Sequence, residues 1–297
     1  GLVSPFGNSL ADFFQRLLNG ESAVHFLRLD DPPRALAIPF VSCPGFAAET
    51  VLGKALAGTM DRFAQLGTAA AFAAWDDAGL GRRPEAESRE HWGVTWGTAL
   101  GGTLAYEKGY RELWQKGRER ISPLSVILGM NNAANAHISI QLALGGVSMS
   151  YTVACASSSI AIGEAFRRVR SGEAPIMLTG GSDVPQAYGV ARAWEALRVL
   201  ASGDETTSAT ACRPFSADRS GLVLGEGEGV VGAQEEAVDR PHGDERFHSL
   251  RLHAALVLER GEGRVRIDEV GDVVLEPGRA EAEAPLEEVL LEADVPA

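Results

Sequence analysis

Cys155 stands between a predicted strand and a predicted helix, a position in which a thiol can act as a nucleophile. The apolar segment VSMSYTVA (147–154) precedes it, and small residues lead into the helical pattern that follows. Apolar residues recur there at helical spacing and end before a glycine placed as a C-cap: Ile162, Ala165, Phe166, Val169 and Gly172. The sequence therefore predicts a sharp strand-to-helix turn, with Cys155 at or just before the helix N-terminus.

A thiol at the start of a helix has two chemical properties that suit acyl transfer. The unpaired N–H groups and the positive end of the helix dipole favour the thiolate, which is the nucleophilic form. The same N–H groups can stabilise an oxyanion on a bound acyl group. Taken alone, a cysteine is more often a buried small hydrophobe, and this alternative stays open from the residues of the turn. Cys43 and Cys212 have no such setting, and we expect both to be structural.

The surrounding segments alternate apolar runs with helical patterns, which is typical of an α/β layered domain with a largely parallel sheet. Ser9 is placed to cap a helix that ends at Gly20, and Asp61 precedes a long Ala-rich helix. The segments that read as strands are HWGVTWGT (91–98), VSMSYTVA (147–154), APIMLTGG (174–181) and LVLGEGEGVV (222–231). Strand-like residues follow the glycines of the last segment, where a dinucleotide-binding loop requires a helix. No cofactor is expected.

Charge divides the chain near residue 233. The 297 residues include 40 Asp and Glu against 27 Lys and Arg, a net charge of −13, and residues 233–297 hold 17 of the acidic and 7 of the basic residues. We therefore expect a domain over 1–232 and an acidic tail over 233–297. Partial alternation in the tail fits either a small antiparallel meander with a short helix at 284–295 or a loosely ordered extension.

The composition also excludes several classes of protein. A net negative chain lacks the basic face needed to bind nucleic acid or anionic lipid unaided. No run of about 18 apolar residues predicts a membrane span, and the first residues lack the pattern of a signal peptide. Three widely spaced cysteines form neither a disulfide framework nor a zinc motif, and no other metal-ligand spacing occurs. We expect a cytoplasmic protein without a metal site.

Several segments together resemble one known family. TVACASSSIAIGEAFRRVRSGEAPIMLTGGSD (152–183) resembles the active-site segment of the β-ketoacyl-acyl-carrier-protein synthases, the condensing enzymes of fatty acid and polyketide synthesis. Other matching segments follow in the family's order: GLVSPFGNSLADFFQRLLNGESAV, DRFAQLGTAAAFAAWDDAGL, WGVTWGTALGG, SPLSVILGMNNAANAHISIQLALGG and RPFSADRSGLVLGEGEGVV. The resemblance covers about residues 1–232.

The resemblance implies a fold, a reaction and a set of site residues. The fold would be thiolase-like, an α/β/α layered sandwich of which this chain supplies the first half of a two-fold repeat. Cys155 would accept an acyl group from acyl carrier protein or coenzyme A as a thioester, and its N–H would be one oxyanion donor. A malonyl thioester would then lose carbon dioxide and attack the acyl carbonyl in a Claisen condensation. Trp194 occupies the position of an aromatic residue in the wall of the family's acyl pocket, and packing in a core accounts for it equally well. Met130, Asn131 and Asn132 match a family segment at the dimer interface and acyl pocket, with Asn131 in place of the usual proline, and we expect Met130 and Asn132 to be pocket residues.

Two features of the family are missing from the sequence. Its second-half catalytic histidines, which would stabilise the enolate formed on decarboxylation, have no counterpart, because His242, His248 and His253 lie in no matching context. The glycine-rich loop that carries the second oxyanion donor is missing as well, and the chain begins after the expected first strand. Three lysines against 24 arginines are typical of a GC-rich gene, in which a shifted reading frame can encode such a tail. The sequence thus looks like the first half of a condensing enzyme joined to an unrelated or out-of-frame tail.

Condensation by this chain alone is therefore not expected. One hypothesis is a synthase whose second half comes from another chain, in a homodimer, as is usual in the family, or in a heterodimer with a synthase. The alternatives are a chain that only acylates itself, a non-catalytic partner of a full-length synthase, and a defective product whose uncovered apolar faces aggregate.

Overall fold

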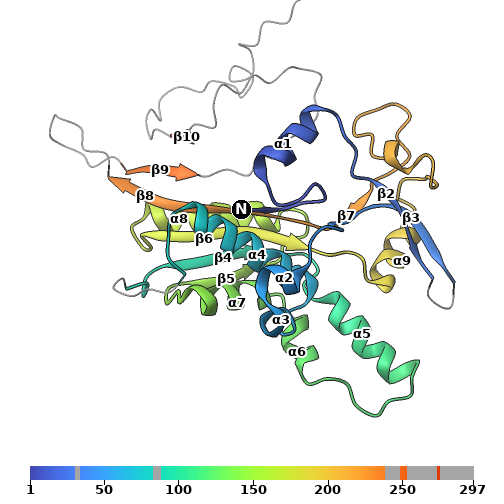
Figure 1. Cartoon of the computed structure of the whole chain (residues 1–297), viewed down its shortest axis with the longest axis horizontal. Helices are drawn as coiled ribbons and strands as arrows, with labels where there is room; N and C mark the ends of the chain where they lie inside the picture. Colours follow the sequence, from blue (N-terminus) through green and yellow to red (C-terminus); the bar gives the residue numbers. More distant parts are fainter. Residues whose placement is uncertain (31–33, 83–87, 238–247, 253–272, 275–297) are drawn as a thin grey trace, which may run out of the picture.

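The computed structural model describes residues 1–30, 34–82, 88–237, 248–252 and 273–274, and its strands form two sheets (Figure 1). The larger sheet has the order β10-β9-β8-β6-β4-β5, with β1 paired to β8, and the smaller has the order β2-β3-β7. The strands are β1 (Leu2–Val3), β2 (His25–Leu29), β3 (Leu36–Val41), β4 (Gly93–Gly97), β5 (Ser148–Tyr151), β6 (Ile176–Asp183), β7 (Leu224–Gly225), β8 (Gly227–Ala237), β9 (His248–Leu252) and β10 (Val273–Val274). The α-helices are α1 (Leu10–Leu18), α2 (Ala48–Leu52), α3 (Lys54–Ala57), α4 (Arg62–Asp77), α5 (Thr103–Trp114), α6 (Leu124–Gly129), α7 (Ala133–Leu142), α8 (Ser157–Arg170) and α9 (Tyr188–Ala196).

The larger sheet is mixed, whereas the sequence predicted a largely parallel one. β4 runs parallel to β5 and β6, but β8 runs antiparallel to β6, and β1 and β9 both pair antiparallel with β8. The register gives the reason, because Asp183 at the end of β6 pairs with Gly227 at the start of β8. The chain leaves the sheet and re-enters it at the same end, so β8 must run in the opposite direction.

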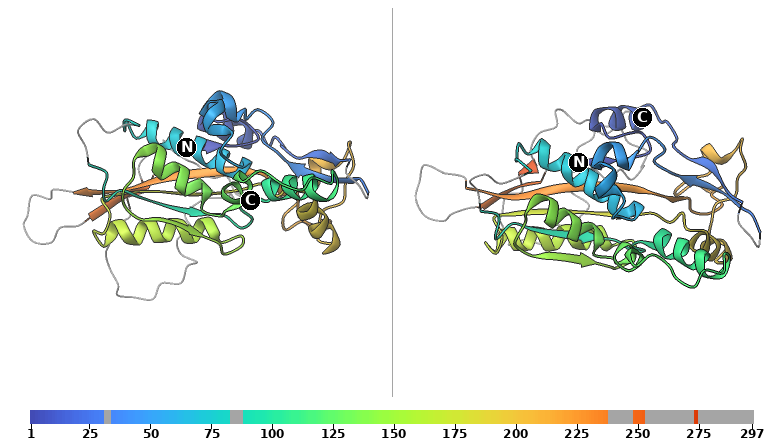
Figure 2. Two further views of the ribbon diagram at one scale, coloured as in Figure 1. Left: turned by 90° about the horizontal axis from the view of Figure 1, so that it is seen from below. Right: turned by 60° about the horizontal axis from the view of Figure 1, so that its bottom comes forward.

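Helices cover both faces of the larger sheet, which gives α/β/α layers. α4 and α7 pack together on one face, and α8 lies on the other (Figure 2). The core under α4 and α7 includes the buried residues Phe63, Leu66, Trp75, Trp96 and Ile138. On the other face Ala165 and Val169 of α8 pack with Met177, as the helical spacing predicted. In the part of the chain that the structure describes, no helix has both the length and the apolar character needed to cross a bilayer.

The helices α1 and α4 begin with the caps that the sequence predicted. The Ser9 hydroxyl accepts a hydrogen bond from the Asp12 N–H at 3.2 Å. One oxygen of Asp61 accepts from the Phe63 N–H at 3.4 Å, and the other accepts from the Ala105 N–H, in the first turn of α5, at 2.6 Å. Burial raises the pKa of Asp61 above its usual value. A single buried carboxyl group therefore joins the N-terminal ends of two helices.

The segment LVLGEGEGVV forms two strands, where the sequence predicted one. β7 pairs with β3 in the smaller sheet, β8 pairs with β6 in the larger sheet, and Glu226 lies between them. Both halves are extended backbone, so the alternation of residues does not reveal the break. The break depends on partners of Glu226 that are far away in the sequence.

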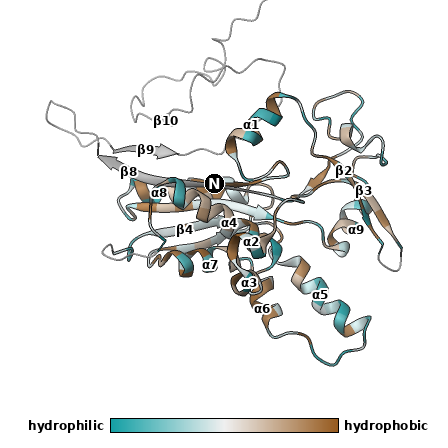
Figure 3. Ribbon diagram, in the orientation of Figure 1, coloured by the Kyte–Doolittle hydropathy of each residue, from teal (hydrophilic) through white to brown (hydrophobic). Residues whose placement is uncertain are grey.

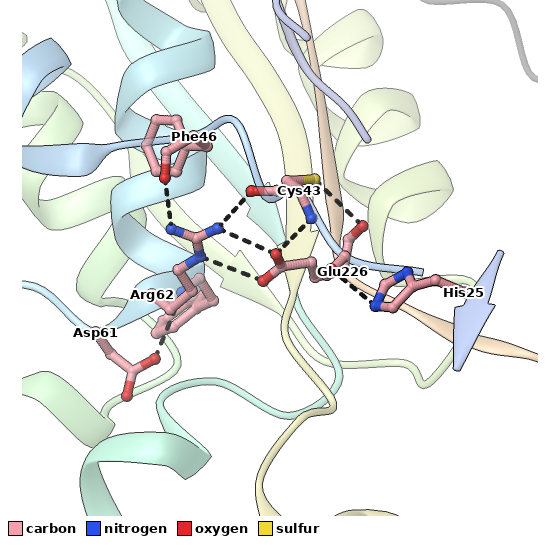
Figure 4. A network of polar contacts seen from close by, with 8 residues as sticks. His25, Cys43, Phe46, Asp61, Arg62 and Glu226 are labelled. Atoms are coloured by element: carbon pink, nitrogen blue, oxygen red, sulfur yellow. Dashed lines mark hydrogen bonds and ion pairs between the residues drawn. The ribbon is translucent and has the colours of Figure 1, made fainter. Parts of the chain in front are cut away.

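Glu226 forms a buried ionic link at the joint between the two sheets, where it is 4% exposed (Figure 4). Its carboxylate accepts the Cys43 N–H at 2.6 Å and pairs with Arg62 of α4, through Nε at 3.2 Å and through Nη2 at 3.0 Å. Arg62 also donates to the carbonyl oxygens of Phe46 and Cys43, each at 3.0 Å. The glutamate of the glycine-rich segment thus connects β3, α4 and the β7–β8 joint.

The helices α5 and α6 form a hairpin that projects from the body of the molecule (Figure 1). Hydropathy colouring shows mainly hydrophobic residues on α6 (Figure 3), and Leu124, Val126 and Ile127 of this helix are between 42% and 56% exposed. On α5 the rings of Tyr110 and Trp114 stack with their centroids 5.0 Å apart. Within the described residues, the hairpin therefore presents an exposed apolar surface.

Only part of the predicted tail lies within the described residues. β9 pairs antiparallel with β8, and β10 pairs antiparallel with β9, which agrees with the meander alternative for these strands. The division of the chain at residue 233 stays a prediction, and β8 crosses that position. The predicted helix at 284–295, together with His242 and His253, lies outside the described residues.

Candidate active site

Cys155 lies in the short turn between β5 and α8, as the sequence predicted. β5 ends at Tyr151, α8 begins at Ser157, and Ala156 occupies the N-cap position. The free thiol of Cys155 is exposed. The thiol thus stands one residue before the helix N-cap, and the alternative of a buried hydrophobic cysteine is removed.

Ser157 holds this turn in shape. Ala154 has a left-handed φ of 49°, a conformation that costs an alanine on the order of 1 kcal/mol. The Ser157 hydroxyl accepts the Val153 N–H at 2.8 Å and donates to the Ala154 carbonyl at 2.6 Å. These hydrogen bonds offset the strain and define where the backbone of Cys155 lies.

Two glycines allow the first turn of α8 to lie directly against the sheet. A Cβ atom at Gly97 of β4 would collide with the backbone of Ser158, and a Cβ atom at Gly181 of β6 would collide with the Ser158 hydroxyl. Further along the helix, the buried hydroxyl of Thr95 donates to the Ala161 carbonyl at 2.9 Å. The sheet therefore sets the depth and the direction of α8, and with them the position of the thiol.

The turn leaves a hydrogen-bond donor beside the thiol. No acceptor lies within hydrogen-bond geometry of the Cys155 N–H in the part of the chain that the structure describes. Cys155 directly precedes the N-cap Ala156, so its backbone lies at the positive end of the α8 dipole. A thioester carbonyl placed over the turn can receive the thiolate at its carbon and the N–H at its oxygen. The arrangement is therefore suited to forming a thioester.

Asp183 shapes the loop beside this turn, although the sequence analysis gave it no role. Its carboxylate accepts hydrogen bonds from the Thr98 hydroxyl at 2.9 Å and from the N–H groups of Ala99 at 2.8 Å and Leu100 at 2.9 Å. Thr98 directly follows the β4 glycine that touches α8, so this loop lies at the same end of the sheet as Cys155. An acidic residue at the carboxyl end of an apolar strand was the available signal.

The three predicted pocket residues lie in two different parts of the molecule. Met130 is 44% exposed in the α6–α7 junction, and Asn132 of the same junction holds the N-cap position of α7 without a side-chain hydrogen bond to the helix. A hydrogen bond connects this junction to the residues just before Cys155. Trp194 of α9 packs instead against the core of the smaller sheet, which includes Phe40. The role of all three in an acyl pocket stays a prediction.

The remaining thiols and one histidine have other surroundings. Cys43 is buried and its N–H bonds to Glu226, which fits the predicted structural role, whereas Cys212 is exposed and lacks the buried setting that such a role implies. His137 lies with Nε2 3.1 Å from the Thr59 carbonyl, and burial lowers the pKa of His137. Among the described residues, no three His, Cys, Asp or Glu side chains gather as metal ligands.

Comparison with known proteins identifies the domain that carries the Cys155 turn. The sequence profile described as "Beta-ketoacyl synthase, N-terminal domain" matches residues 1–237. The chain is 33% identical over 232 residues to 3-oxoacyl-[acyl-carrier-protein] synthase 2 of Staphylococcus aureus, which covers 78% of this chain and 56% of that protein. Nodulation protein E of Rhizobium leguminosarum bv. trifolii is 41% identical over 173 residues, which covers 58% of this chain and 41% of that protein.

A solved structure has the same fold over the matched part. The crystal structure of a β-ketoacyl synthase from Burkholderia phymatum STM815 is similar with a TM-score of 0.67 and 25% identity, over 80% of this chain and 57% of that one. The chain spans about half the length of the curated relatives it matches, and the matched half includes the Cys155 turn. The chain belongs to the β-ketoacyl synthase family and carries that family's N-terminal domain.

Proposed function

We propose that Cys155 accepts an acyl group as a thioester, and that this chain supplies the acyl-accepting half of a β-ketoacyl synthase. The observation that carries the proposal is the exposed thiol in the turn immediately before α8. The similarity to an acyl-carrier-protein synthase supports the choice of substrate class. The acyl donor is then a thioester of acyl carrier protein or of coenzyme A.

The acylation step balances with the groups found in the turn. The Cys155 thiolate attacks the carbonyl carbon of the donor thioester and forms a C–S bond, while the Cys155 N–H stabilises the oxyanion. The tetrahedral intermediate then expels the donor's thiolate, which takes up a proton equivalent to the one that Cys155 released. One thioester replaces another, so the step needs no redox partner.

The second reaction of a synthase needs groups beyond this turn. Decarboxylation of a malonyl thioester forms an enolate that requires hydrogen-bond donors aimed at its oxygen. Two histidines of the described residues already have other hydrogen-bond partners, because His25 is bonded to Ser42 and His137 to the Thr59 carbonyl. Because the chain spans about half of its relatives, we propose that a second half, on the same protein or on another chain, supplies these donors. The assembled enzyme would then elongate fatty acid or polyketide intermediates in the cytoplasm.

A dimer, either with a second copy or with another synthase, is part of the proposal. Within the described residues β5 is the edge strand of the larger sheet, and Met149 on this strand is 44% exposed. Ile140 of α7 is 71% exposed and Ile160 of α8 is 42% exposed. An exposed strand edge with apolar neighbours is a template for pairing. Two structures of similar fold are named as ketosynthase and chain length factor assemblies, which supports pairing with a related chain.

Acyl transfer to Cys155 tests the central proposal. We expect incubation with an acyl-coenzyme A or acyl carrier protein thioester to add one acyl group per chain, located on Cys155 by peptide mass spectrometry. Cys155→Ala should remove the adduct. Cys212→Ser is the matched control, because it removes another exposed thiol, and it should leave the adduct unchanged. Equal labelling of both cysteines, or no label on Cys155, would contradict the proposal.

The fate of the acyl group distinguishes two candidate functions. The first is the acyl-accepting half of a synthase, and the second is a self-acylating or non-catalytic partner. The chain is loaded with a labelled acyl group and mixed with malonyl thioester and a full-length synthase whose own nucleophilic cysteine has been replaced. Label in a β-ketoacyl product supports the synthase half, and label that stays on Cys155 supports the second candidate. Product from this chain alone would show that no second half is needed.

A further inference from the structure

A ladder of polar residues joins α7 to β5, the strand that leads to Cys155. Three members are four residues apart on α7 and just before it, and three alternate along β5 and just after it: Asn131, Asn135 and Ser139 on the first side, and Ser148, Ser150 and Thr152 on the second. The two spacings match, because four helical residues rise about 6 Å and two strand residues about 6.7 Å. The two rows can therefore bond to one another along their whole length.

The hydrogen bonds of Ser139 and Asn135 to Ser148 and Ser150 define the register of β5 against α7. Ser139 and Ser148 share a hydrogen bond of 3.1 Å between their hydroxyls, and Asn135 donates to the Ser148 hydroxyl at 2.9 Å. Ser150 donates to Asn135 Oδ1 at 2.6 Å. Asn135 is only 2% exposed, so its amide must find partners within the protein. A slip of the strand by one residue would leave this amide unsatisfied.

The hydrogen bond between Asn131 and Thr152 is the part of the ladder that lies nearest to Cys155 in the sequence. Asn131 Nδ2 donates to the Thr152 hydroxyl at 3.0 Å, three residues before Cys155, and the Asn131 carbonyl lies 3.1 Å from the Ser150 hydroxyl. Gly101 has a left-handed φ of 59°, and a Cβ atom there would collide with Asn131 Oδ1. Asn131 therefore lies between the loop that Asp183 anchors and the strand that carries the nucleophile, and its hydrogen bond to Thr152 is exposed to solvent.

The two sides of the turn are held by different residues. Ser157 binds the helix side through Val153 and Ala154. On the strand side, the side-chain hydrogen bond that the structure shows at Thr152, within its described residues, is the one from Asn131. Removal of the Asn131 hydrogen bond would leave the Thr152 side chain without this restraint, while the Tyr151 carbonyl would still accept a hydrogen bond from the Thr98 N–H at 3.1 Å.

We propose that Asn131 is a positioning residue for Cys155, which acts through Thr152 to keep the thiol at the N-terminus of α8. The consequence for acyl transfer rests on the proposed function, but the positioning itself can be measured without it. A thiol displaced from the helix end has a different access to solvent and different backbone surroundings, and we expect its reaction with electrophiles to slow.

Alkylation of two thiols in one molecule tests this role. Cys155 and Cys212 are both exposed, so we expect both to react with iodoacetamide, and mass spectrometry follows the two rates from about pH 6 to about pH 9. Asn131→Ala and Thr152→Val should each lower the Cys155 rate relative to Cys212 by about tenfold, and the double variant should lower it no further. Thr152→Ser keeps the hydroxyl and should retain the wild-type ratio across the pH range.

Ser139→Ala is the matched control, because it removes a hydroxyl from the far end of the same ladder. If it slows Cys155 as much as Asn131→Ala does, the effect is a general loosening of β5 and the positioning role is wrong. An unchanged ratio in Asn131→Ala, with a native circular dichroism spectrum, would also overturn the role.

The same variants are then treated with an acyl thioester. If wild-type Cys155 is never acylated while alkylation follows the expected pattern, the proposed function fails and the positioning role stands.

Discussion

The Cys155 turn and the Glu226 joint are built from opposite kinds of interaction. The turn is shaped by neutral groups, namely the Ser157 and Thr152 hydroxyls and close contacts at glycines, and it leaves a thiol exposed. The joint is shaped by a carboxylate and a guanidinium whose side chains are 2% and 25% exposed. Buried charge defines one arrangement of the two sheets, because an unpaired ion there is costly. The side-chain hydrogen bonds that the structure shows at the Cys155 turn, within its described residues, join neutral groups.

Glu226→Ala is expected to have the largest effect, and that effect should be confined to stability. It leaves the Arg62 guanidinium partly buried without its carboxylate, and breaking one side of such a pair costs about 3–5 kcal/mol. Chemical denaturation measures the loss, and Cys155 of the native protein should keep its alkylation rate. Glu205→Ala is the matched control, because the Arg28–Glu205 pair is well exposed, and it should cost less than about 1 kcal/mol. Equal losses in the two variants would remove the distinction between buried and exposed pairs.

Gly97→Ala should lower stability less but should also change the reactivity of the thiol. Its new methyl group would push the first turn of α8 away from the sheet, at a cost of about 1–3 kcal/mol, and alkylation of Cys155 should slow relative to Cys212. Gly163→Ala is the control within α8, since a Cβ atom there meets nothing within 4 Å. We expect it to stabilise the protein by up to about 1 kcal/mol and to leave alkylation unchanged. An unchanged alkylation rate of Cys155 in Gly97→Ala would show that the contact between the first turn of α8 and the sheet does not position the thiol.

Asp61→Ala should have a smaller effect on unfolding, about 1–2 kcal/mol, because it removes a carboxyl group that accepts hydrogen bonds at the start of two helices. Ser9→Ala removes the cap of one exposed helix and should cost about 0.5–1 kcal/mol. Thermal melts of both variants measure the difference. If Asp61→Ala is no more damaging than Ser9→Ala, the carboxyl group does not join α4 to α5.

The smallest expected effect is a change of stability with pH that comes from His137. Burial lowers its pKa in the folded protein from the ordinary value of 6.5, so the unfolded chain binds this proton more readily. Stability should therefore be complete above about pH 6.5 and decline as the pH falls through 6.5 toward the folded pKa. Melting temperatures between about pH 8 and about pH 5 would show the decline. His137→Gln keeps an amide donor for the Thr59 carbonyl and should make the curve flatter, and an unchanged curve would assign the decline to other groups.

Local patterns were enough to predict the parts of the site that depend on neighbouring residues. The strand, the turn and the helix around Cys155 were predicted from an apolar run, small residues and helical spacing, and the caps at Ser9 and Asp61 from residue type. The resemblance to a known family then supplied the chemistry. These signals extend over fewer than about 20 residues, which is the range over which periodicity is informative.

Contacts between distant segments could not be predicted in the same way. The break between β7 and β8 depends on Arg62, which is 164 positions from Glu226, and the alternation of residues in LVLGEGEGVV continues through it. The Asn131–Thr152 rung joins residues 21 positions apart, and each is unremarkable in its own segment. The antiparallel direction of β8 follows from where the chain re-enters the sheet, which depends on the intervening α9 and the smaller sheet.

Ala154 restricts how the approach to the thiol can be redesigned. Its backbone is left-handed, and residues branched at Cβ are disfavoured there, whereas glycine and asparagine adopt this conformation more readily. Engineering aimed at a different acyl chain should therefore place its substitutions elsewhere, or restrict this position to alanine, glycine and asparagine. A library that varies Ala154 without this restriction would contain many variants in which the Cys155 turn is deformed even without a substrate.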